Sequence, residues 1–337
     1  MGKVDKPDLP VLAIDLGGTK IIAAIISSNV EILARDYHLT LASKGPQAVI
    51  DRVIACIDQL LGKNNVELSQ ISSISIAAAG AVDSSRGLVT SSPHLPGFDD
   101  VPLRDIVKEK CGVNTFLLND ASAAALGEHR FGAGKGVKNL IYLTVSTGIG
   151  GGIIIDRKLY LGLSGTAGEV GHMTIEVNGP GCSCGSKGCW EQLASGTALA
   201  REAVRRIRQG EVSSLTEMVR GKLENITAEK VSVAAQGGDP LALEAISEVA
   251  YYLGVGLANL VNIFNPEMII IGGGMAKTGE LLLKPAREVV LKRAFRLPAQ
   301  AVSIVPSQLG DDAGVIGAAV FALKDRKSKL ELSDYLQ

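Results

Sequence analysis

The sequence lacks a strong excess of charge of either sign. Its 337 residues include 34 Lys and Arg against 35 Asp and Glu, so the formal net charge is −1. Because nucleic-acid-binding domains usually carry a clustered basic excess, we expect no nucleic-acid partner. Apolar residues make up 46% of the chain, which is enough for a large core, and the length suits two domains.

Long apolar segments and an apolar leader are also lacking. No apolar run is expected to reach the length of a membrane helix. Residues 1–10 are polar and charged, unlike the apolar core of a signal peptide. We therefore expect no membrane partner and a cytoplasmic location. Aromatic residues make up only 4%, whereas Gly numbers 39, a composition that favours tight turns and close backbone approach.

Cysteine and histidine are scarce, and their distribution is uneven. Three of the five Cys and one of the four His fall within the eighteen residues 172–189. The other two cysteines, Cys56 and Cys111, lie in apolar, periodic segments, where buried thiols in a reducing compartment are favoured over a disulfide. The cluster consists of His172, Cys182, Cys184 and Cys189.

A set of three cysteines and one histidine predicts a structural zinc site. Four strong ligands complete a tetrahedron around Zn²⁺ and leave no open position for catalysis. The loop 179–188 is Gly-rich and has no hydrophobic period, so burial could not order it, and zinc would supply the missing free energy of folding. The alternative is three unrelated cysteines in a loop. Glu169 and Glu191 lie beside the cluster and could face a polar ligand or, as most Glu do, the solvent.

Two Gly/Thr turns repeat one pattern. Residues 11–26 and 140–155 each consist of an apolar strand, a short turn and a second strand rich in β-branched residues. We therefore expect two α/β lobes of related topology. The candidate residues are Asp15, Gly17, Gly18, Thr19 and Lys20 in the first turn, and Thr147 and Gly148 in the second.

Turns of this kind can bind phosphate. Glycine lets a phosphate approach backbone N–H groups, and Asp15 could hold a hydrated Mg²⁺. A plain hairpin turn explains one such turn equally well. The second copy and a third glycine run, Gly272, Gly273 and Gly274, favour a phosphate site. Neither a Walker loop nor the dinucleotide fingerprint Gly-x-Gly-x-x-Gly occurs, so those two nucleotide-binding folds have no support.

Asn119 and Asp120 follow an apolar strand expected at 115–118 and precede a helix expected at 121–128. Ligands of open α/β sheets bind at the carboxyl ends of strands, where Asp120 could accept a proton from a substrate hydroxyl. The local sequence alone favours the simpler interpretation that one of the two residues caps the helix.

Periodicity and turn residues predict the remaining elements. The glycines at 272–274 are expected to open a helix directly after a strand, and the last helix is small and apolar, which suits close packing. Strands are expected near 31–38, 71–78, 267–271 and 302–305, and helices near 46–61, from Pro102 onward, and near 240–263 and 313–323.

These residues together resemble the ROK family of sugar kinases and sugar-responsive repressors. The sequence carries the complete combination Gly-Glu-x-Gly-His, ending at His172, and Cys-x-Cys-Gly-x-x-Gly-Cys-x-Glu, ending at Glu191. The resemblance extends from the first turn to the last helix and is strongest to the bacterial ROK glucokinases. Residues 93–98 are similar to a loop of those enzymes, which more often has Asn and Trp in place of His94 and Phe98.

The resemblance implies an α/β fold of two ribonuclease-H-like lobes with a cleft between them, the actin-like ATPase or sugar kinase fold. We expect a smaller lobe formed by residues 1–120 and a larger lobe, 121–311, that carries the zinc loop. A C-terminal helix, 312–325, is expected to pack back on the smaller lobe.

The resemblance also implies a role for each candidate residue. Asp120 would be the general base that takes the proton from the sugar hydroxyl. The two turns would bind the phosphates of ATP, with Asp15 near Mg²⁺, and the glycines at 272–274 would border the adenosine. The residues that would bind sugar hydroxyls are Asn119, Glu169, His172 and Glu191. The zinc ligands would be Cys182, Cys184, Cys189 and again His172, which would thus serve both sites.

The implied activity is ATP-dependent phosphorylation of a hexose, with glucose converted to glucose 6-phosphate. N-acetylmannosamine or fructose is the alternative acceptor, because pocket shape and not these motifs decides among them. Family repressors carry a helix-turn-helix domain before the first strand, and only about ten residues precede that strand here. A sugar-responsive regulator is therefore the less favoured interpretation. The family also implies a homodimer or homotetramer.

Overall fold

The computed structural model of the protein describes residues 9–328. Contacts between residues divide the chain into two compact units. The first contains the chain up to Gly136, Gly152–Gly168 and the chain from Asp311 onward, and the second contains Val137–Gly151 and Glu169–Gly310. This division places the last helix in the same unit as the N-terminal residues, as expected. It also places residues 121–136 and 152–168 in the first unit. The expected lobe boundary at residue 120 stays a prediction.

The first unit is built on a five-stranded sheet with the order β3-β2-β1-β4-β8. Strand β2 is antiparallel to both of its neighbours, β1 and β3, whereas β4 and β8 run parallel to β1. Every residue of β4 is buried, as expected for a strand whose two faces are both covered. The strands are β1 (Val11–Leu16), β2 (Lys20–Ile26), β3 (Ile32–Leu39), β4 (Ser73–Ala78) and β8 (Thr115–Asn119).

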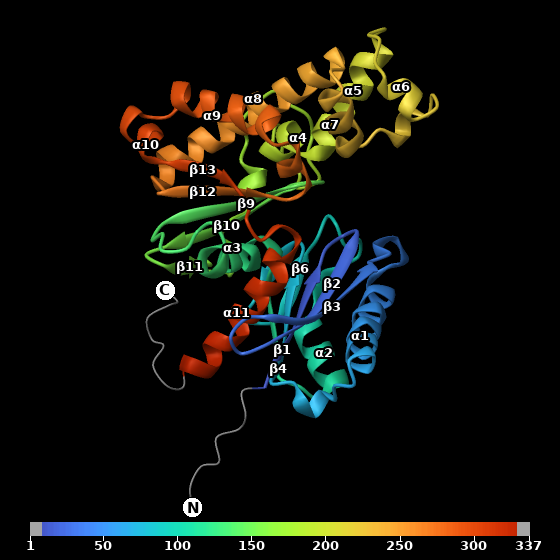
Figure 1. Ribbon diagram of the computed structural model, residues 1–337, viewed down its shortest axis with the longest axis vertical. Helices are drawn as coiled ribbons and strands as arrows, with labels where there is room; N and C mark the ends of the chain where they lie inside the picture. Colours follow the sequence, from blue (N-terminus) through green and yellow to red (C-terminus); the bar gives the residue numbers. More distant parts are fainter. Residues whose placement is uncertain (1–8, 329–337) are drawn as a thin grey trace, which may run out of the picture. The chain divides into compact units, whose positions relative to one another are not determined.

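Helices cover both faces of this sheet (Figure 1). The apolar sides of α1 and α2 form one core with Leu12, Ile14 and Leu16 of β1, and α11 packs against β1 and β4 from the other side. The helices of the first unit are α1 (Pro46–Lys63), α2 (Leu103–Cys111), α3 (Asp120–Phe131) and α11 (Ala313–Ser328).

Two glycines let α3 and α11 approach each other closely. A Cβ at Gly317 would lie 1.6 Å from the carbonyl oxygen of Ala123, and a Cβ at Gly127 would lie 2.5 Å from the carbonyl oxygen of Ala313. The expected close packing of the small, apolar last helix is therefore confirmed. Because α3 begins at Asp120, this contact fixes the position of Asp120 relative to the start of α11.

A second five-stranded sheet repeats the plan with the order β11-β10-β9-β12-β13. Three strands consecutive in sequence are followed by two later ones, as in the first sheet, and β12 pairs parallel with β9 and β13. The expected α/β class and the repeated strand–turn–strand pattern are confirmed. The strands are β9 (Leu140–Val145), β10 (Ile149–Ile155), β11 (Lys158–Tyr160), β12 (Met268–Gly272) and β13 (Ser303–Pro306).

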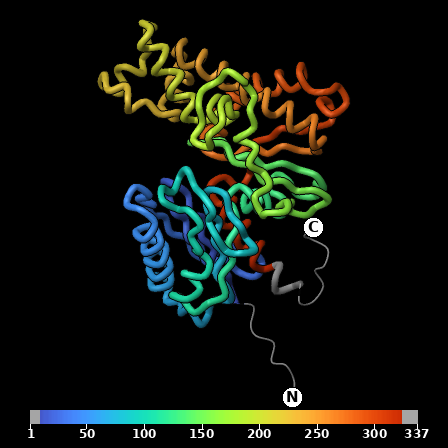
Figure 2. Tube along the Cα trace, turned by 180° about the vertical axis from the view of Figure 1, so that it is seen from behind, coloured from blue at the N-terminus to red at the C-terminus, as the bar shows by residue number. Residues whose placement is uncertain are grey.

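The second unit contains most of the helices. Figure 2 shows, in yellow-green, the long connection between β11 and α4 that includes the cysteine-rich loop. The helices are α4 (Trp190–Ala194), α5 (Gly196–Arg208), α6 (Leu215–Met218), α7 (Ala228–Gln236), α8 (Pro240–Phe264), α9 (Glu280–Arg293) and α10 (Arg296–Ala301).

Helix α8 corrects the expectation that no apolar run is long enough to span a membrane. Among the residues that the structure describes, this 25-residue helix is long and apolar enough to cross a membrane, judged by length and composition alone. Of its most apolar 18-residue stretch, 61% is buried within the protein. Leu253, Leu257 and Val261 lie in the core of the second unit. A helix that is apolar on most sides is typical of such a core, and this helix is consistent with that role.

Two further parts of the structure differ from the sequence prediction. A three-stranded antiparallel sheet, β5 (Ala81–Asp83), β6 (Leu88–Ser91) and β7 (Asp99–Val101), has strands too short to show a period. The glycines at 272–274 open only a short 3-10 helix, Gly274–Thr278, and not directly the long helix that follows. Helix α9 begins only after Gly279, whose φ of 67° interrupts the helical backbone.

Candidate functional site

Four side chains of the second unit converge to form a cluster the size of a metal site. The ligand atoms of His172, Cys182, Cys184 and Cys189 all lie within 4.8 Å of one another. Cys182 Sγ lies 3.7 Å from His172 Nδ1, and Cys184 Sγ lies 3.6 Å from Cys189 Sγ. Sulfur ligands at tetrahedral positions around zinc lie about 3.8 Å apart. The geometry therefore fits the predicted zinc ion, with Nδ1 as the ligand atom of His172.

The ionisation of the thiols also fits a bound cation. Burial raises the pKa of Cys189 to about 12, and the neighbouring Cys184 and Cys182 add to that shift. A hydrogen bond from the backbone of Ser186 lowers the pKa of Cys184. Thiolates this close oppose one another's ionisation, and a divalent ion would relieve that repulsion and hold them deprotonated. Sulfur and imidazole donors suit zinc better than Mg²⁺ or Ca²⁺.

Backbone contacts, not buried side chains, shape the loop that carries the thiols. None of residues 181–187 is buried. Gly188 has a φ of 63°, and a Cβ there would lie 1.6 Å from the carbonyl oxygen of Glu176. The backbone N–H of Cys182 donates to the Ser186 carbonyl at 2.9 Å. A loop with so little burial gains order from metal binding, as the sequence predicts.

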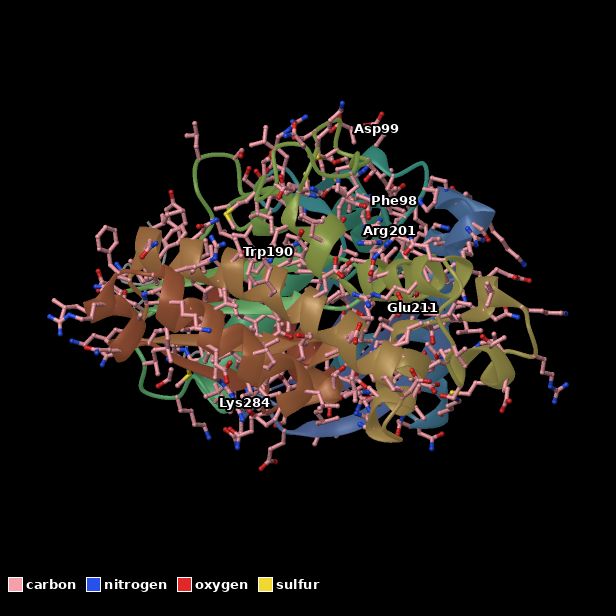
Figure 3. All side chains as sticks on the ribbon, turned by 90° about the horizontal axis from the view of Figure 1, so that it is seen from above. Phe98, Asp99, Trp190, Arg201, Glu211 and Lys284 are labelled. Carbon is pink, nitrogen blue, oxygen red and sulfur yellow. The ribbon has the colours of Figure 1, made fainter. Side chains whose placement is uncertain are left out.

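Helix α4 places Glu191 two residues after the last thiol. Trp190, labelled in Figure 3, is fully buried, and its indole Nε1 donates to the carbonyl oxygen of Tyr252 in α8 at 2.9 Å. Its ring packs against Gly256, where a Cβ would lie 2.0 Å from Cε2. Glu191 Oε2 accepts a hydrogen bond from the backbone of Ile149 at 2.9 Å. The buried tryptophan thus fixes Cys189 and Glu191 to the core of the second unit.

Glu169 lies close to the metal cluster and to Glu191. Its side chain is exposed, yet the protein around the carboxylate reduces its hydration and raises the pKa of Glu169, while His172 lowers it and Glu191 raises it further. The backbone at Gly171 packs directly against that of Ile149, since a Cβ at position 171 would lie 2.1 Å from the Ile149 carbonyl oxygen. The second unit therefore brings three of the four predicted sugar-binding residues together.

The second Gly/Thr turn lies in the same unit. The backbone N–H of Ser146 donates to the Gly148 carbonyl at 2.9 Å, and Gly196 N–H donates to the Ser146 carbonyl at 2.7 Å. Thr197 Oγ1 donates to the Thr147 carbonyl at 2.8 Å. The turn is thus held by its neighbours while the Thr147 side chain is exposed. Its role in binding phosphate stays a prediction.

The glycine run at 272–274 lies against the end of β9. A Cβ at Gly272 would lie 2.1 Å from the hydroxyl oxygen of Tyr142, and a Cβ at Gly273, whose φ is 81°, would lie 2.5 Å from the Val145 carbonyl oxygen. Gly274 is exposed. Packing alone therefore requires the first two glycines, and their contact with adenosine stays a prediction.

The first Gly/Thr turn joins β1 to β2 in the first unit. The backbone N–H of Gly17 donates to the Lys20 carbonyl at 2.9 Å, and Thr40 Oγ1 donates to the Gly17 carbonyl at 2.6 Å. A Cβ at Gly18 would lie 2.7 Å from the carbonyl oxygen of His94. The turn is therefore rigid, and it abuts the loop at 93–98 that resembles the glucokinase loop.

Asp15 lies at the end of β1 beside the start of α11. Burial raises the pKa of Asp15 to about 6, while Lys20 lowers it and Asp311 raises it. A Cβ at Gly314 would lie 2.4 Å from Asp15 Oδ2. Lys20 Nζ donates to Asp311 Oδ1 at 2.8 Å. The three charged side chains thus form one group, and no local pattern in the sequence points to Asp311.

The raised pKa of Asp15 predicts a stability change in the protein without Mg²⁺. A carboxyl group whose pKa is higher in the folded state binds more protons when folded, so stability falls as the pH rises from 3.8 to about 6 and stays reduced above it. Asp15→Asn should raise the free energy of unfolding at pH 7 by up to about 3 kcal/mol, and by much less near pH 4. Urea denaturation at both pH values measures this change.

Asp83 provides the matched control, because its hydrogen bond from Ser85 lowers the pKa of the Asp83 carboxyl. Asp83→Asn should lower the free energy of unfolding at pH 7. Equal or lower stability of Asp15→Asn at that pH would contradict the assigned effect of burial.

Asn119 and Asp120 end β8 and begin α3. Asn119 Oδ1 accepts from the Ser122 N–H at 2.9 Å, which confirms the expected helix cap. Its Nδ2 donates to the Gly80 carbonyl at 2.9 Å and to Asp120 Oδ1 at 3.0 Å. Asp120 Oδ1 also accepts from the Ala121 N–H at 2.8 Å. Asn119 is therefore the cap, and two donors orient the carboxylate of Asp120.

The strands of the first sheet bring these residues to one edge. Ala78, the last residue of β4, pairs with Leu16 of β1 and with Asn119 of β8, and all three strands are parallel. Asp120 and the first turn consequently lie at the carboxyl ends of β8 and β1, with only β4 between them. This edge is where open α/β sheets bind ligands.

Comparison with known proteins identifies relatives of this arrangement. A model of the ROK family matches residues 11–325. The glucokinase of Thermotoga maritima is 37% identical over an alignment that covers 93% of this chain and 97% of that protein. The xylose repressor of Caldicellulosiruptor bescii is also 37% identical, over 97% of this chain and 81% of the repressor.

Solved structures agree with these relatives. The crystal structure of a ROK family glucokinase from Streptomyces griseus, in complex with glucose and AMPPNP, superposes with a TM-score of 0.84. It is 37% identical, and the match covers 93% of this chain and 98% of that one. The expected actin-like ATPase fold is therefore confirmed, and the cysteine–histidine cluster agrees with the zinc-binding motif of the family.

Proposed function

The chain belongs to the ROK family, and from that premise we propose that it is a kinase that transfers the γ-phosphoryl group of ATP to a hexose. Glucose is the acceptor that we expect, with glucose 6-phosphate as the product. The relative from T. maritima is named a glucokinase, and the relative from S. griseus was crystallised with glucose and AMPPNP. Both are similar to this chain over nearly its whole length.

The observation that carries the proposal is the shared edge of the first sheet. The oriented carboxylate of Asp120 and the turn that bears Lys20 lie at the ends of strands separated only by β4. Phosphoryl transfer needs a group that orients the attacking hydroxyl and groups that neutralise charge on the transferred phosphate. A carboxylate and a cationic, glycine-rich turn are the residue types that this chemistry requires.

Asp120 acts as the general base in the proposed reaction. The hydrogen bonds from Asn119 and Ala121 hold its Oδ1 atom in place. The sugar hydroxyl donates to this carboxylate and transfers its proton as its oxygen bonds to the γ-phosphorus and the bond from that phosphorus to the leaving oxygen of ADP breaks. Backbone N–H groups of the turn and the ammonium of Lys20 would hold the phosphate oxygens, and Asp15 would hold the hydrated Mg²⁺ that neutralises their charge.

The metal cluster supports the sugar site of the second unit in this proposal. Zinc would be held by His172 Nδ1 and the three thiols and would supply folding free energy to the loop. Through His172, the ordered loop would keep Glu169 in place, whereas the buried Trp190 and the Ile149 N–H hold Glu191. These acidic side chains and His172 then bind sugar hydroxyls by hydrogen bonds.

A panel of sugars tests the activity. Purified protein with ATP and Mg²⁺ should release ADP in the presence of glucose, and the ratio kcat/KM should be higher for glucose than for N-acetylmannosamine or fructose. Higher kcat/KM for either alternative sugar would correct the substrate but not the reaction. No ADP release with any hexose or amino sugar would refute the kinase proposal.

A sugar-responsive regulator is the second candidate, because the xylose repressor of C. bescii is as similar in sequence as the glucokinases. Kinase activity is favoured because the chain keeps both Asp120 and the glycine-rich turn. A gel shift with operator DNA, run beside the ADP assay, separates the two functions. Sugar-dependent DNA binding without ADP release would favour the regulator.

A further inference from the structure

We propose that Asp311 is a positioning residue for Lys20, and that it holds the ammonium group at the first turn in the place where the phosphates of ATP bind. This inference rests on the proposed kinase function and adds one residue to its nucleotide site. Lys20 Nζ donates to Asp311 Oδ1 at 2.8 Å, although 291 positions separate the two residues in sequence.

Lys20 needs such a partner because its own segment fixes only its backbone. The turn is closed by the hydrogen bond from Gly17 to Lys20, and β2 begins at Lys20 itself. A lysine side chain beyond this point has several rotatable bonds, so its ammonium group samples many positions unless an acceptor holds it. Asp311 is an acceptor supplied by a distant part of the chain.

The fold joins Asp311 to the first unit through α11. It lies in the short segment Gly310–Asp312 that leads into α11, and the first turn of α11 touches Asp15 at Gly314. Close packing at Gly317 then locks α11 against α3. The carboxylate that holds Lys20 is thus fixed to the same frame that positions Asp15 and the helix begun by Asp120.

Stability does not account for the pair. The side chain of Lys20 is 35% exposed and that of Asp311 is 58% exposed. Ion pairs with this much exposure contribute little to folding, because water and salt screen them. Their location beside the phosphate turn points instead to a role in binding the nucleotide.

Two effects of Asp311 on ATP oppose each other and must be separated. Its carboxylate holds Lys20 in place, which favours the phosphates, but its negative charge repels them. Asp312 supplies the matched control, because it carries the same charge one residue further on and pairs with Arg35. Asp311→Asn and Asp312→Asn both remove one negative charge, but only the first removes the partner of Lys20.

The two variants are compared by calorimetric titration with MgATP in the absence of sugar and by steady-state kinetics of ADP release. Asp311→Asn should raise the Kd and KM for ATP about three- to tenfold, the usual penalty for having to immobilise one long side chain on binding. The KM for the hexose and the melting temperature should not change. Asp312→Asn should change the ATP values less than about twofold, because screened charge alone acts there.

A double-mutant cycle with Lys20→Met provides the readout that a merely structural role would not give. If Asp311 acts through Lys20, Asp311→Asn should have no further effect on ATP binding once Lys20 is replaced. An undiminished effect in the Lys20→Met background, or equal effects of Asp311→Asn and Asp312→Asn, would overturn the inference. Wild-type protein that neither binds ATP nor releases ADP would overturn the proposed function and this inference together. Normal ATP values for Asp311→Asn in an active enzyme would overturn the inference alone.

Discussion

Asp120→Asn should leave hexose binding nearly unchanged and lower kcat by about a hundred- to ten-thousandfold, the usual contribution of a general base. The substituted amide has the shape of the carboxylate, and its Oδ1 can still accept the hydrogen bond from Ala121. The cap of α3 is also retained, because Asn119 and not Asp120 accepts from Ser122. What the variant loses is the ability to take up a proton, so the effect should fall on kcat.

The control for this variant is Asp105→Asn. Asp105 lies in the first turn of α2, as Asp120 lies in the first turn of α3, but on an exposed surface where it pairs with Arg104. Its replacement should leave kcat unchanged. Calorimetric titration measures hexose binding to each variant. A kcat for Asp120→Asn within about threefold of the wild-type value would refute the base assignment. Loss of hexose binding would make Asp120 a binding residue instead.

Cys184→Ser should remove zinc and weaken hexose binding at least about tenfold, since changes around a metal site commonly reduce affinity or activity by that factor. A serine hydroxyl is a poor zinc ligand at neutral pH, and three remaining donors do not complete a tetrahedron. Cys184 is exposed, so its replacement leaves no cavity in the core. The effect on the sugar should therefore arise from the loop, which relaxes and releases His172 and the neighbouring Glu169.

Cys111→Ser is the matched control, because Cys111 is half-buried in α2, outside the metal cluster. Elemental analysis should find about one zinc per chain in the wild type and in this control, and almost none in Cys184→Ser. The hexose Kd of each protein follows from calorimetric titration. A zinc-free Cys184→Ser protein with the wild-type hexose Kd would eliminate the supporting role of the metal loop.

The metal cluster could be predicted because all four ligands lie within eighteen residues, and their spacing alone limits what they can do. The two Gly/Thr turns could be predicted as turns for the same reason, since each is a local pattern between two apolar strands. The helix cap at Asn119 could also be predicted locally, and the hydrogen bond from the Ser122 N–H confirms it. The role of Asp120 as the base stays a prediction, because a helix cap explains the local sequence equally well.

Local patterns also misled in two places. Helix α8 has the composition of a membrane helix, and only its packing shows that it lies in the core of the second unit. The glycines at 272–274 predict the start of a long helix, but only a short 3-10 segment follows them, and packing against Tyr142 and Val145 is by itself enough to require the first two. Composition cannot distinguish a glycine needed by a neighbour from one needed by a ligand, because both leave the same empty space beside the backbone.

The sequence by itself determined the ligand set for zinc, the two turns and the α/β class, because each of these depends on residues that are close neighbours along the chain. Only the tertiary structure decided that Asp120 and Lys20 share one sheet edge and that Lys20 is paired with Asp311. Those relations join segments up to 291 positions apart. The register of strands and the packing of α11 set them, and neither leaves a periodic or compositional mark on the residues concerned.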